Sequence, residues 1–175
     1  MKSVLNFALF QAAWFAAILG GANGWPLLGA LPAAGIVAFH LWLNQRQFWR
    51  ELSLIAAVTV LGFIIEGGFM AAGLLTFAGT TPSQVLPPLC IVALWLAFGT
   101  LPNASLSWLK GRWRLQAALG AIAGPLTYVG GAKLGAAAIA EPMSLSVIAI
   151  GLAWALVMPV IFLLAEQLTP KAAVP

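Results

Sequence analysis

Charged side chains are scarce in this chain. Only 7% of its 175 residues are charged, four acidic and eight basic, whereas a soluble domain carries about 25%. Hydrophobic residues make up 62% of the chain, and the mean hydropathy is +1.01. Because so few charges cannot cover the surface of a globular protein, the composition excludes a soluble fold.

Cysteine and histidine are almost absent, with Cys90 and His40 the single residue of each kind. One cysteine cannot form an intrachain disulfide, and one Cys with one His makes a zinc site unlikely to form. His40 is predicted to be an ordinary interfacial histidine. The chain also lacks a nucleophile elbow, a phosphate loop and an acidic dyad. No catalytic residue, metal or cofactor is therefore predicted, and an enzyme is the least favoured class.

Long apolar runs dominate what remains. In lipid, backbone polar groups must be satisfied internally, which helices achieve, whereas barrel strands would alternate in hydrophobicity. Since a span needs about 20 residues, we expect an all-α polytopic membrane protein, a six-transmembrane-helix bundle in a single domain (1–175). Polar residues within the first run favour a spanning helix over a cleaved signal peptide. The predicted helices cover about 3–19, 25–43, 52–77, 87–109, 115–138 and 142–165.

The basic residues stand singly at the ends of these runs, so they set orientation and do not form a nucleic-acid-binding patch. With the N-terminus inside, seven of the eight basic residues fall on the cytoplasmic side. The eighth, Lys133, lies within the fifth helix, and the outer loops carry no Lys or Arg. The positive-inside rule therefore predicts that both termini are cytoplasmic. The seven residues are Lys2, Arg46, Arg50, Lys110, Arg112, Arg114 and Lys171.

Glu66 is the most informative residue, because it interrupts the third apolar run. It lies roughly 21 Å along that helix at the α-helical rise, where a charged, unpaired carboxylate costs several kcal/mol. At about 100° per residue, Thr59, Gly62 and Met70 share its face. That small, polar face should pack inward. Glu66 is then either a proton- or ligand-binding carboxylate or the acceptor of a structural hydrogen bond between helices.

The fifth helix offers two candidate neighbours of Glu66. Tyr128 falls beside a face of spaced glycines that permits close helix packing, whereas Lys133 lies roughly opposite that face. Lys133 could form an ion pair with Glu66, extend to the headgroups, or pair with Glu141. The glycines of that face are Gly120, Gly124, Gly131 and Gly135.

Polar residues also close the fourth helix, where Asn103, Ser105 and Ser107 follow Pro102. They could line a polar vestibule, but hydrogen bonding between helices or around the proline kink is the favoured interpretation. Three tryptophans near mid-membrane are interpreted as packing residues, although three indoles could also form the wall of an apolar cavity. They are Trp14, Trp95 and Trp154. The candidate binding residues of the chain are therefore Glu66, Lys133, Tyr128, Thr59 and Asn103.

Several runs resemble one known family. The segment 94–101 followed by 105–109 is similar to the fourth helix of a family of small bacterial inner-membrane proteins of unknown function. The segment 119–136 is similar to the fifth helix of that family, and 61–75 to its third, where an acidic residue is expected at the position of Glu66. The resemblance implies a six-helix protein of the bacterial inner membrane, found beside lipid-modifying enzymes. It implies no activity.

Three functions remain open at this stage. The first is a binding or transport module for a small or lipidic molecule, anchored at Glu66. The second is an accessory or assembly protein of a lipid-modifying pathway, with a membrane enzyme or a second copy as its partner. The third is an intramembrane enzyme that uses Glu66 and Lys133. A cavity at Glu66 would favour the binding or transport module. A carboxylate whose hydrogen bonds are all satisfied by neighbouring helices would favour the accessory protein. Membrane lipids are expected partners in all three, and nucleic acid in none.

Overall fold

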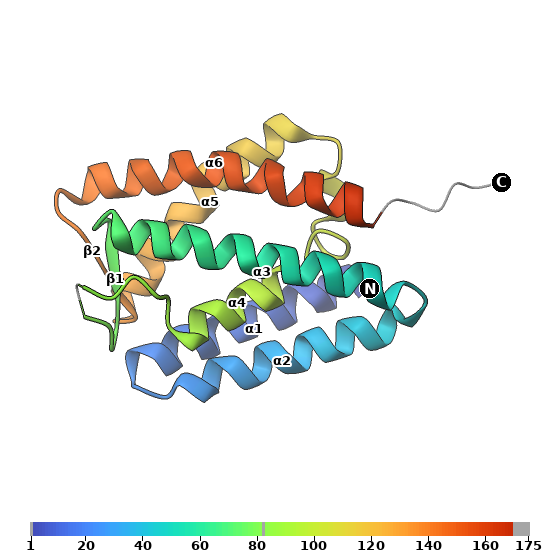
Figure 1. Ribbon diagram of the computed structural model, residues 1–175, viewed down its shortest axis with the longest axis horizontal. Coiled ribbons are helices and arrows are strands. Elements are labelled where there is room, and N and C mark those ends of the chain that lie inside the picture. The colour runs from blue at the N-terminus through green and yellow to red at the C-terminus, as the bar shows by residue number, and fades with distance from the viewer. Residues whose placement is uncertain (1, 82, 170–175) are drawn as a thin grey trace.

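The computed structural model describes residues 2–81 and 83–169. The described residues form six α-helices that run back and forth along one long axis, with α5 inclined across the others (Figure 1). The all-α prediction is confirmed, and each predicted helix overlaps an observed one. The helices are α1 (Lys2–Ala22), α2 (Pro26–Leu43), α3 (Phe48–Ala71), α4 (Leu89–Phe98), α5 (Trp113–Lys133) and α6 (Met143–Leu168).

Glycine ends three of these helices in the same way. Gly24, Gly73 and Gly135 follow α1, α3 and α5 with φ of 73°, 67° and 82°. After each glycine, the next amide donates to a carbonyl five residues back, for example Leu74 to Phe69 at 2.9 Å. This is the Schellman arrangement, which needs a left-handed residue and therefore favours glycine.

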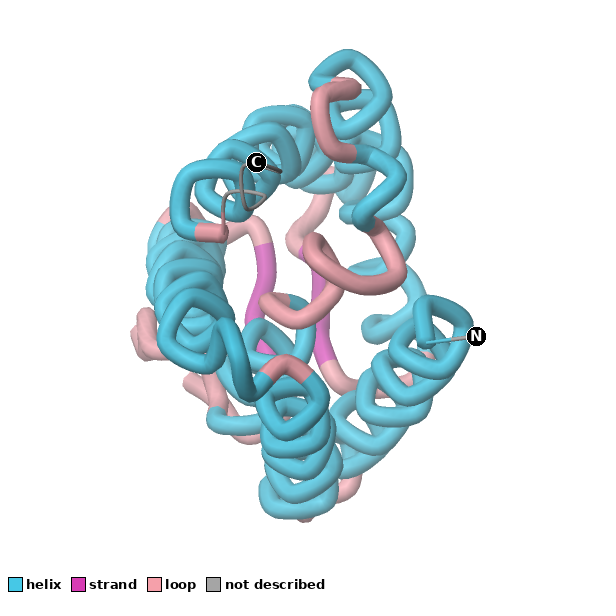
Figure 2. The backbone as a smooth tube through the Cα atoms, turned by 90° about the vertical axis from the view of Figure 1, so that its right-hand side faces the viewer, coloured by secondary structure: helices cyan, strands magenta, loops and turns pink. Residues whose placement is uncertain are grey.

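A two-stranded antiparallel ribbon, which the sequence did not predict, follows two of these glycines. Strand β1 (Leu75–Phe77) pairs with β2 (Ala137–Ile139), with Thr76 opposite Ala138. The predicted extension of the third helix to Phe77 and of the fifth to Ala138 is therefore wrong, because Gly73 and Gly135 stop both helices. Viewed along the helices, the ribbon crosses the space that they surround (Figure 2).

Helix α4 is much shorter than predicted. It ends at Phe98, and residues 99–112 form turns and a short 3₁₀ helix (Ser107–Leu109) where the sequence predicted helix to 109. Pro102 lacks the amide hydrogen and has a ring that clashes with the preceding turn, so it prevents continuation. Non-helical backbone at membrane depth is tolerated where protein covers it. The first turn of this segment is buried, whereas Ser107, Trp108, Gly111 and Arg112 are exposed. Its buried residues include Thr100, Leu101, Pro102 and Leu109.

Three helical segments are long and apolar enough to cross a membrane, namely Ser3–Ala22, Gln45–Ala71 and Met143–Leu168. The ten residues of α4 extend only about 15 Å, half of the roughly 30 Å hydrocarbon core. Large apolar side chains also point outward from several helices, such as Val4 at 74% and Leu156 at 72% exposure. Such a surface suits lipid as the surrounding solvent.

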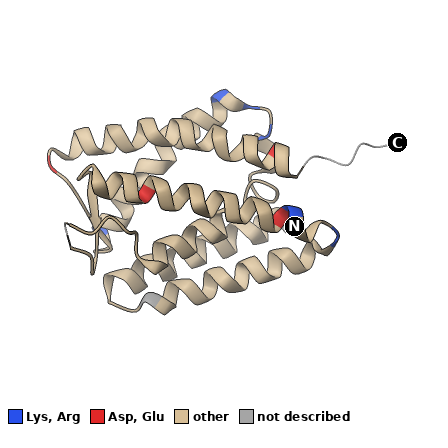
Figure 3. Ribbon diagram, in the orientation of Figure 1, with Lys and Arg blue, Asp and Glu red and all other residues tan. Residues whose placement is uncertain are grey.

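Basic residues gather at one end of the molecule. In Figure 3 they lie around the turn between α2 and α3 and at the start of α5, which is the end where α1 begins and α6 finishes. The opposite end holds Glu141, exposed in the loop before α6, and Lys133, exposed at the end of α5. The predicted cytoplasmic residue Lys171 lies outside the described residues.

The first two glycines of the glycine face, Gly120 and Gly124, pack against α6, whereas Gly131 and Gly135 lie beside α1. A Cβ added at Gly120 would lie 2.2 Å from the carbonyl oxygen of Trp154, and one at Gly124 would lie 2.4 Å from its indole ring. Since carbon atoms in contact are normally 3.5–4.0 Å apart, only glycine permits this approach. On the other side of the bundle, α4 is central and contacts α1, α2 and α3.

Gly120→Ala should therefore destabilise the protein. The added methyl group must push α5 from α6, which costs about 1–3 kcal/mol, and unfolding in detergent followed by circular dichroism measures the loss. Gly35→Ala is the matched control, because its Cβ meets nothing within 4 Å and it should gain about 0.5–1 kcal/mol in helix α2. Equal stability of Gly120→Ala and the native protein would contradict the close contact.

Candidate functional site: a cavity with a buried carboxylate

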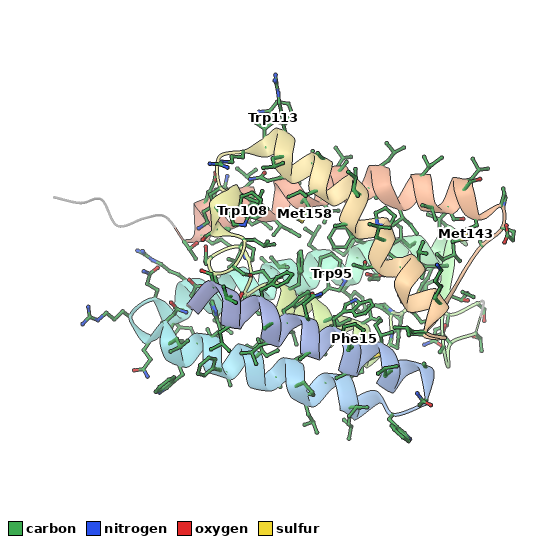
Figure 4. The ribbon with its side chains drawn as sticks, turned by 180° about the vertical axis from the view of Figure 1, so that it is seen from behind. Phe15, Trp95, Trp108, Trp113, Met143 and Met158 are labelled. Atoms are coloured by element: carbon green, nitrogen blue, oxygen red, sulfur yellow. The ribbon has the colours of Figure 1, made fainter. Side chains whose placement is uncertain are left out.

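An apolar cavity of about 640 Å³ lies between α1, α4 and α5, with α6 contributing part of its wall. This volume falls within the roughly 300–1,000 Å³ of typical small-molecule sites. The segment 101–109 borders one end, and residues of both ribbon strands border the other. The cavity is open to the outside rather than enclosed. Figure 4 shows Trp95 in the space between α1 and α5, which diverge there.

Glu66 forms part of this wall, although its side chain is only 3% exposed. Its Oε1 accepts hydrogen bonds from the Tyr128 hydroxyl at 2.6 Å and from the Trp95 indole nitrogen at 3.0 Å. The Trp154 indole nitrogen donates in turn to the Tyr128 hydroxyl at 3.4 Å. The network thus joins α3, α4, α5 and α6. The other carboxyl oxygen, Oε2, is buried and has no hydrogen-bond partner in the described structure.

Two glycines make this network sterically feasible. Gly62 lies one turn before Glu66, and a Cβ there would lie 1.9 Å from the Trp95 ring. Gly124 lies one turn before Tyr128 and makes the same room for Trp154. The two indoles then stack with ring centroids 5.2 Å apart and an interplanar angle of 18°. Glu66 and Tyr128 are thus each preceded, one turn earlier, by a glycine against which an indole ring packs.

The structure brings together only some of the predicted site residues. Tyr128 contacts Glu66 directly, as its position beside the glycine face suggested. Thr59 donates to the Ile55 carbonyl within its own helix and does not line the cavity. Lys133 is exposed at the end of α5, and no hydrogen bond or ion pair joins it to Glu66 in the described part of the chain.

Asn103 belongs to a second network near the basic end. Its amide nitrogen donates to both carboxyl oxygens of Glu51 at 3.0 Å, and Glu51 also pairs with His40 at 3.0 Å. The amide oxygen of Asn103 accepts from Lys110 at 2.5 Å and from Thr169 at 3.1 Å. These bonds attach the irregular segment 99–112 to α2, α3 and α6. His40 is buried and joined to Glu51 by a hydrogen bond, a contact that the sequence did not predict.

Sequence reasoning missed the hydrogen bonds of Trp95 and Trp154, which were interpreted as packing residues or as part of a cavity wall; both do line the cavity. Their indole nitrogens complete the hydrogen-bond network around Glu66. Apolar helices use tryptophan for packing far more often than for hydrogen bonding to an acid. The one signal was the glycine one turn before Glu66 and before Tyr128, which indicates a bulky neighbour from another helix.

The cavity combines one acid with aromatic faces. Among the described residues that line it there is no Lys, Arg or His, and no group of His, Cys, Asp or Glu in the described chain could hold a metal ion. The arrangement lacks a second titratable group to act as base or acid beside Glu66 at neutral pH. It can hold an apolar molecule and accept a hydrogen bond from it.

Fold and site together define an all-helical protein with an apolar exterior and a ligand-sized cavity. The sequence matches one family model over residues 3–160, and the chain belongs to that family, described as "Protein of unknown function (DUF2878)". The predicted membership of an uncharacterised family is therefore confirmed. No curated protein and no solved structure matches the chain. The Glu66 network lies wholly within the matched region.

Tyr128→Phe should weaken the network around the carboxyl group. The change removes the 2.6 Å bond to Glu66 and the acceptor of the Trp154 indole. The free energy of unfolding should fall by about 1–3 kcal/mol, measured by denaturant titration in detergent. Thr127→Val is the neighbouring control, since its hydroxyl donates only to a carbonyl of its own helix. Equal effects of the two substitutions would show that the tyrosine hydroxyl is dispensable.

Proposed function

We propose that this protein binds a small apolar or lipidic molecule in the cavity between α1, α4 and α5, with Glu66 as its polar anchor. The observation that carries the proposal is the unpartnered Oε2 of a buried carboxyl group in the wall of an open, ligand-sized cavity. Buried polar atoms are almost always hydrogen-bonded, and leaving one unsatisfied costs about 1–3 kcal/mol. A ligand that donates to Oε2 would remove this cost.

Rotation about the last side-chain torsion of Glu66 would give the ligand access to Oε2. Oε2 is buried, but the final torsion of glutamate lies in a broad minimum. We infer that a rotation about this torsion turns Oε2 toward the cavity, and because both oxygens move together, Tyr128 and Trp95 must follow Oε1. The donors on Oε1 thus hold the carboxyl group in place and leave the second oxygen to the ligand.

The half-satisfied carboxyl group favours binding over the two other functions. An accessory role predicts a carboxyl group that is fully satisfied by its helix neighbours, and only one oxygen of Glu66 is. The enzyme hypothesis requires Glu66 and Lys133 within hydrogen-bonding reach in the cavity, and Lys133 does not line it. Binding, with or without transport, is therefore the function that the geometry supports best.

The membrane arrangement is part of the proposal. We place the protein in a bacterial inner membrane with six crossings and both termini in the cytoplasm. The fourth crossing would combine α4 with the segment 99–112, which continues from α4 toward the basic end and is buried over residues 99–102 (Figure 1). The gathering of basic residues at the end where α1 begins supports this orientation.

Cysteine labelling tests the orientation. Because Cys90 is the single cysteine and is buried, a Cys90→Ala background should be silent. In that background, Ser83→Cys should react with a membrane-impermeant maleimide on intact spheroplasts, whereas Gln45→Cys should react only after lysis. Both positions are exposed, so the reversed pattern would reject the orientation, and labelling of both on intact cells would reject the crossing between them.

Native mass spectrometry of the purified protein tests the binding. The native protein should retain a small or lipidic molecule. The fraction of Glu66→Gln protein that carries this molecule should be at least tenfold lower than that of the native protein. The amide oxygen can still accept from Tyr128 and Trp95, so folding should survive, but an NH₂ group in place of Oε2 repels a donor. The same spectra report the oligomeric state.

Glu141→Gln is the matched control, because it removes one exposed carboxylate at the far end of α5 and α6. Its bound fraction should equal that of the native protein. Equal retention by Glu66→Gln would contradict the role of the carboxyl group, and absence of any bound molecule from the native protein would contradict the binding function.

A further inference from the structure

The chemistry of the cavity wall selects among ligand classes, on the premise that the proposed binding function holds. Glu66 is the only acidic residue among the described lining residues, and none of them is basic. An anionic ligand would find no positive partner and would face the carboxylate. In a poorly solvated site such like-charge contact is strongly unfavourable. The cavity therefore disfavours fatty acids, phosphates and other anions.

Aromatic rings surround the carboxyl group. Trp95 and Trp154 stack against each other, and Phe98 meets both edge-on at 5.7 and 5.8 Å between centroids. Tyr128 lies 6.5 Å from Trp154. All four rings line the cavity. The rings therefore give a ligand an apolar contact surface.

The donors of the site are already used. The Tyr128 hydroxyl and the Trp95 indole both donate to Oε1 of Glu66, and the Trp154 indole donates to Tyr128. A ligand acceptor would have to break these bonds, whereas a ligand donor can take the vacant Oε2 without breaking any. The arrangement thus favours a ligand whose polar group donates hydrogen bonds and accepts none.

We propose that the cavity binds a lipophilic amine, with its ammonium group on Oε2 of Glu66 and its apolar body against the rings and helix surfaces of the cavity. An ammonium group has donors and no acceptor. It also gains the attraction of the carboxylate, which an alcohol of equal length does not. The cavity is open to the outside, so such a molecule can enter it.

A binding assay at pH 7 tests this proposal. It measures how tightly four radiolabelled twelve-carbon amphiphiles bind to the protein in zwitterionic nanodiscs. Dodecylammonium carries a positive charge and hydrogen-bond donors, whereas dodecyltrimethylammonium carries the positive charge without donors. Dodecanol has a neutral hydrogen-bond donor, and dodecanoate carries a negative charge. Empty nanodiscs correct for partition into lipid. Dodecylammonium should bind at least tenfold more tightly than dodecanol, dodecyltrimethylammonium should fall between them, and dodecanoate should not bind above the empty discs.

Glu66→Gln should weaken the binding of dodecylammonium at least tenfold and the binding of dodecanol less than threefold. Glu141→Gln should change the binding of neither compound. The ranking of the four ligands is measured on the native protein, so it does not depend on the folding of any variant. Dodecanol binding as tightly as dodecylammonium would overturn the amine while leaving the binding function intact. Tight dodecylammonium binding that Glu66→Gln does not change would also overturn it. Absence of binding by all four compounds would contradict the binding function as well.

Discussion

The hydrogen bonds to one oxygen of Glu66 are the interaction on which the centre of the molecule depends. A carboxyl group that is 97% buried is tolerated only with partners, and its partners come from helices far apart in the sequence. Tyr128 and Trp95 each donate directly, and Trp154 donates through Tyr128. Satisfying the acid therefore requires α3, α4, α5 and α6 to meet at one point. The cavity lies beside that point because the same side chains form its wall.

The two ends of the bundle are held by different means. Near the basic end, Asn103 connects the irregular segment after α4 to Glu51 on α3 and to Thr169 after α6. At the far end, the β1–β2 ribbon joins the ends of α3 and α5 through backbone hydrogen bonds. Between these ends the cavity lies open beside the packed core of the bundle. A rigid frame around an open side is what a binding site for an apolar molecule needs.

Much of the helical framework could be predicted from the sequence, and the errors have local causes. Apolar runs located all six helices, and the face of Glu66 was correctly expected to point inward. The far ends of the third and fifth helices were misplaced, because an apolar run continues through Gly73 and Gly135 as a strand as readily as it would as a helix. The fourth helix was predicted too long, since a proline inside an apolar run can mean either a kink or an end. Here the helix ends, and residues 99–102 after it are buried.

By itself, then, the sequence determined the helical class, the apolar exterior, the uneven placement of basic residues and the need to bury Glu66. Those properties follow from composition and from the helical period, which are local. The tertiary structure alone decided that Tyr128 and two tryptophans satisfy one carboxyl oxygen, that Lys133 stays outside and that Asn103 joins Glu51. Such pairings depend on which helix faces meet. The helical period of 3.6 residues predicts which residues share a face of a helix, but not which other helix packs against that face.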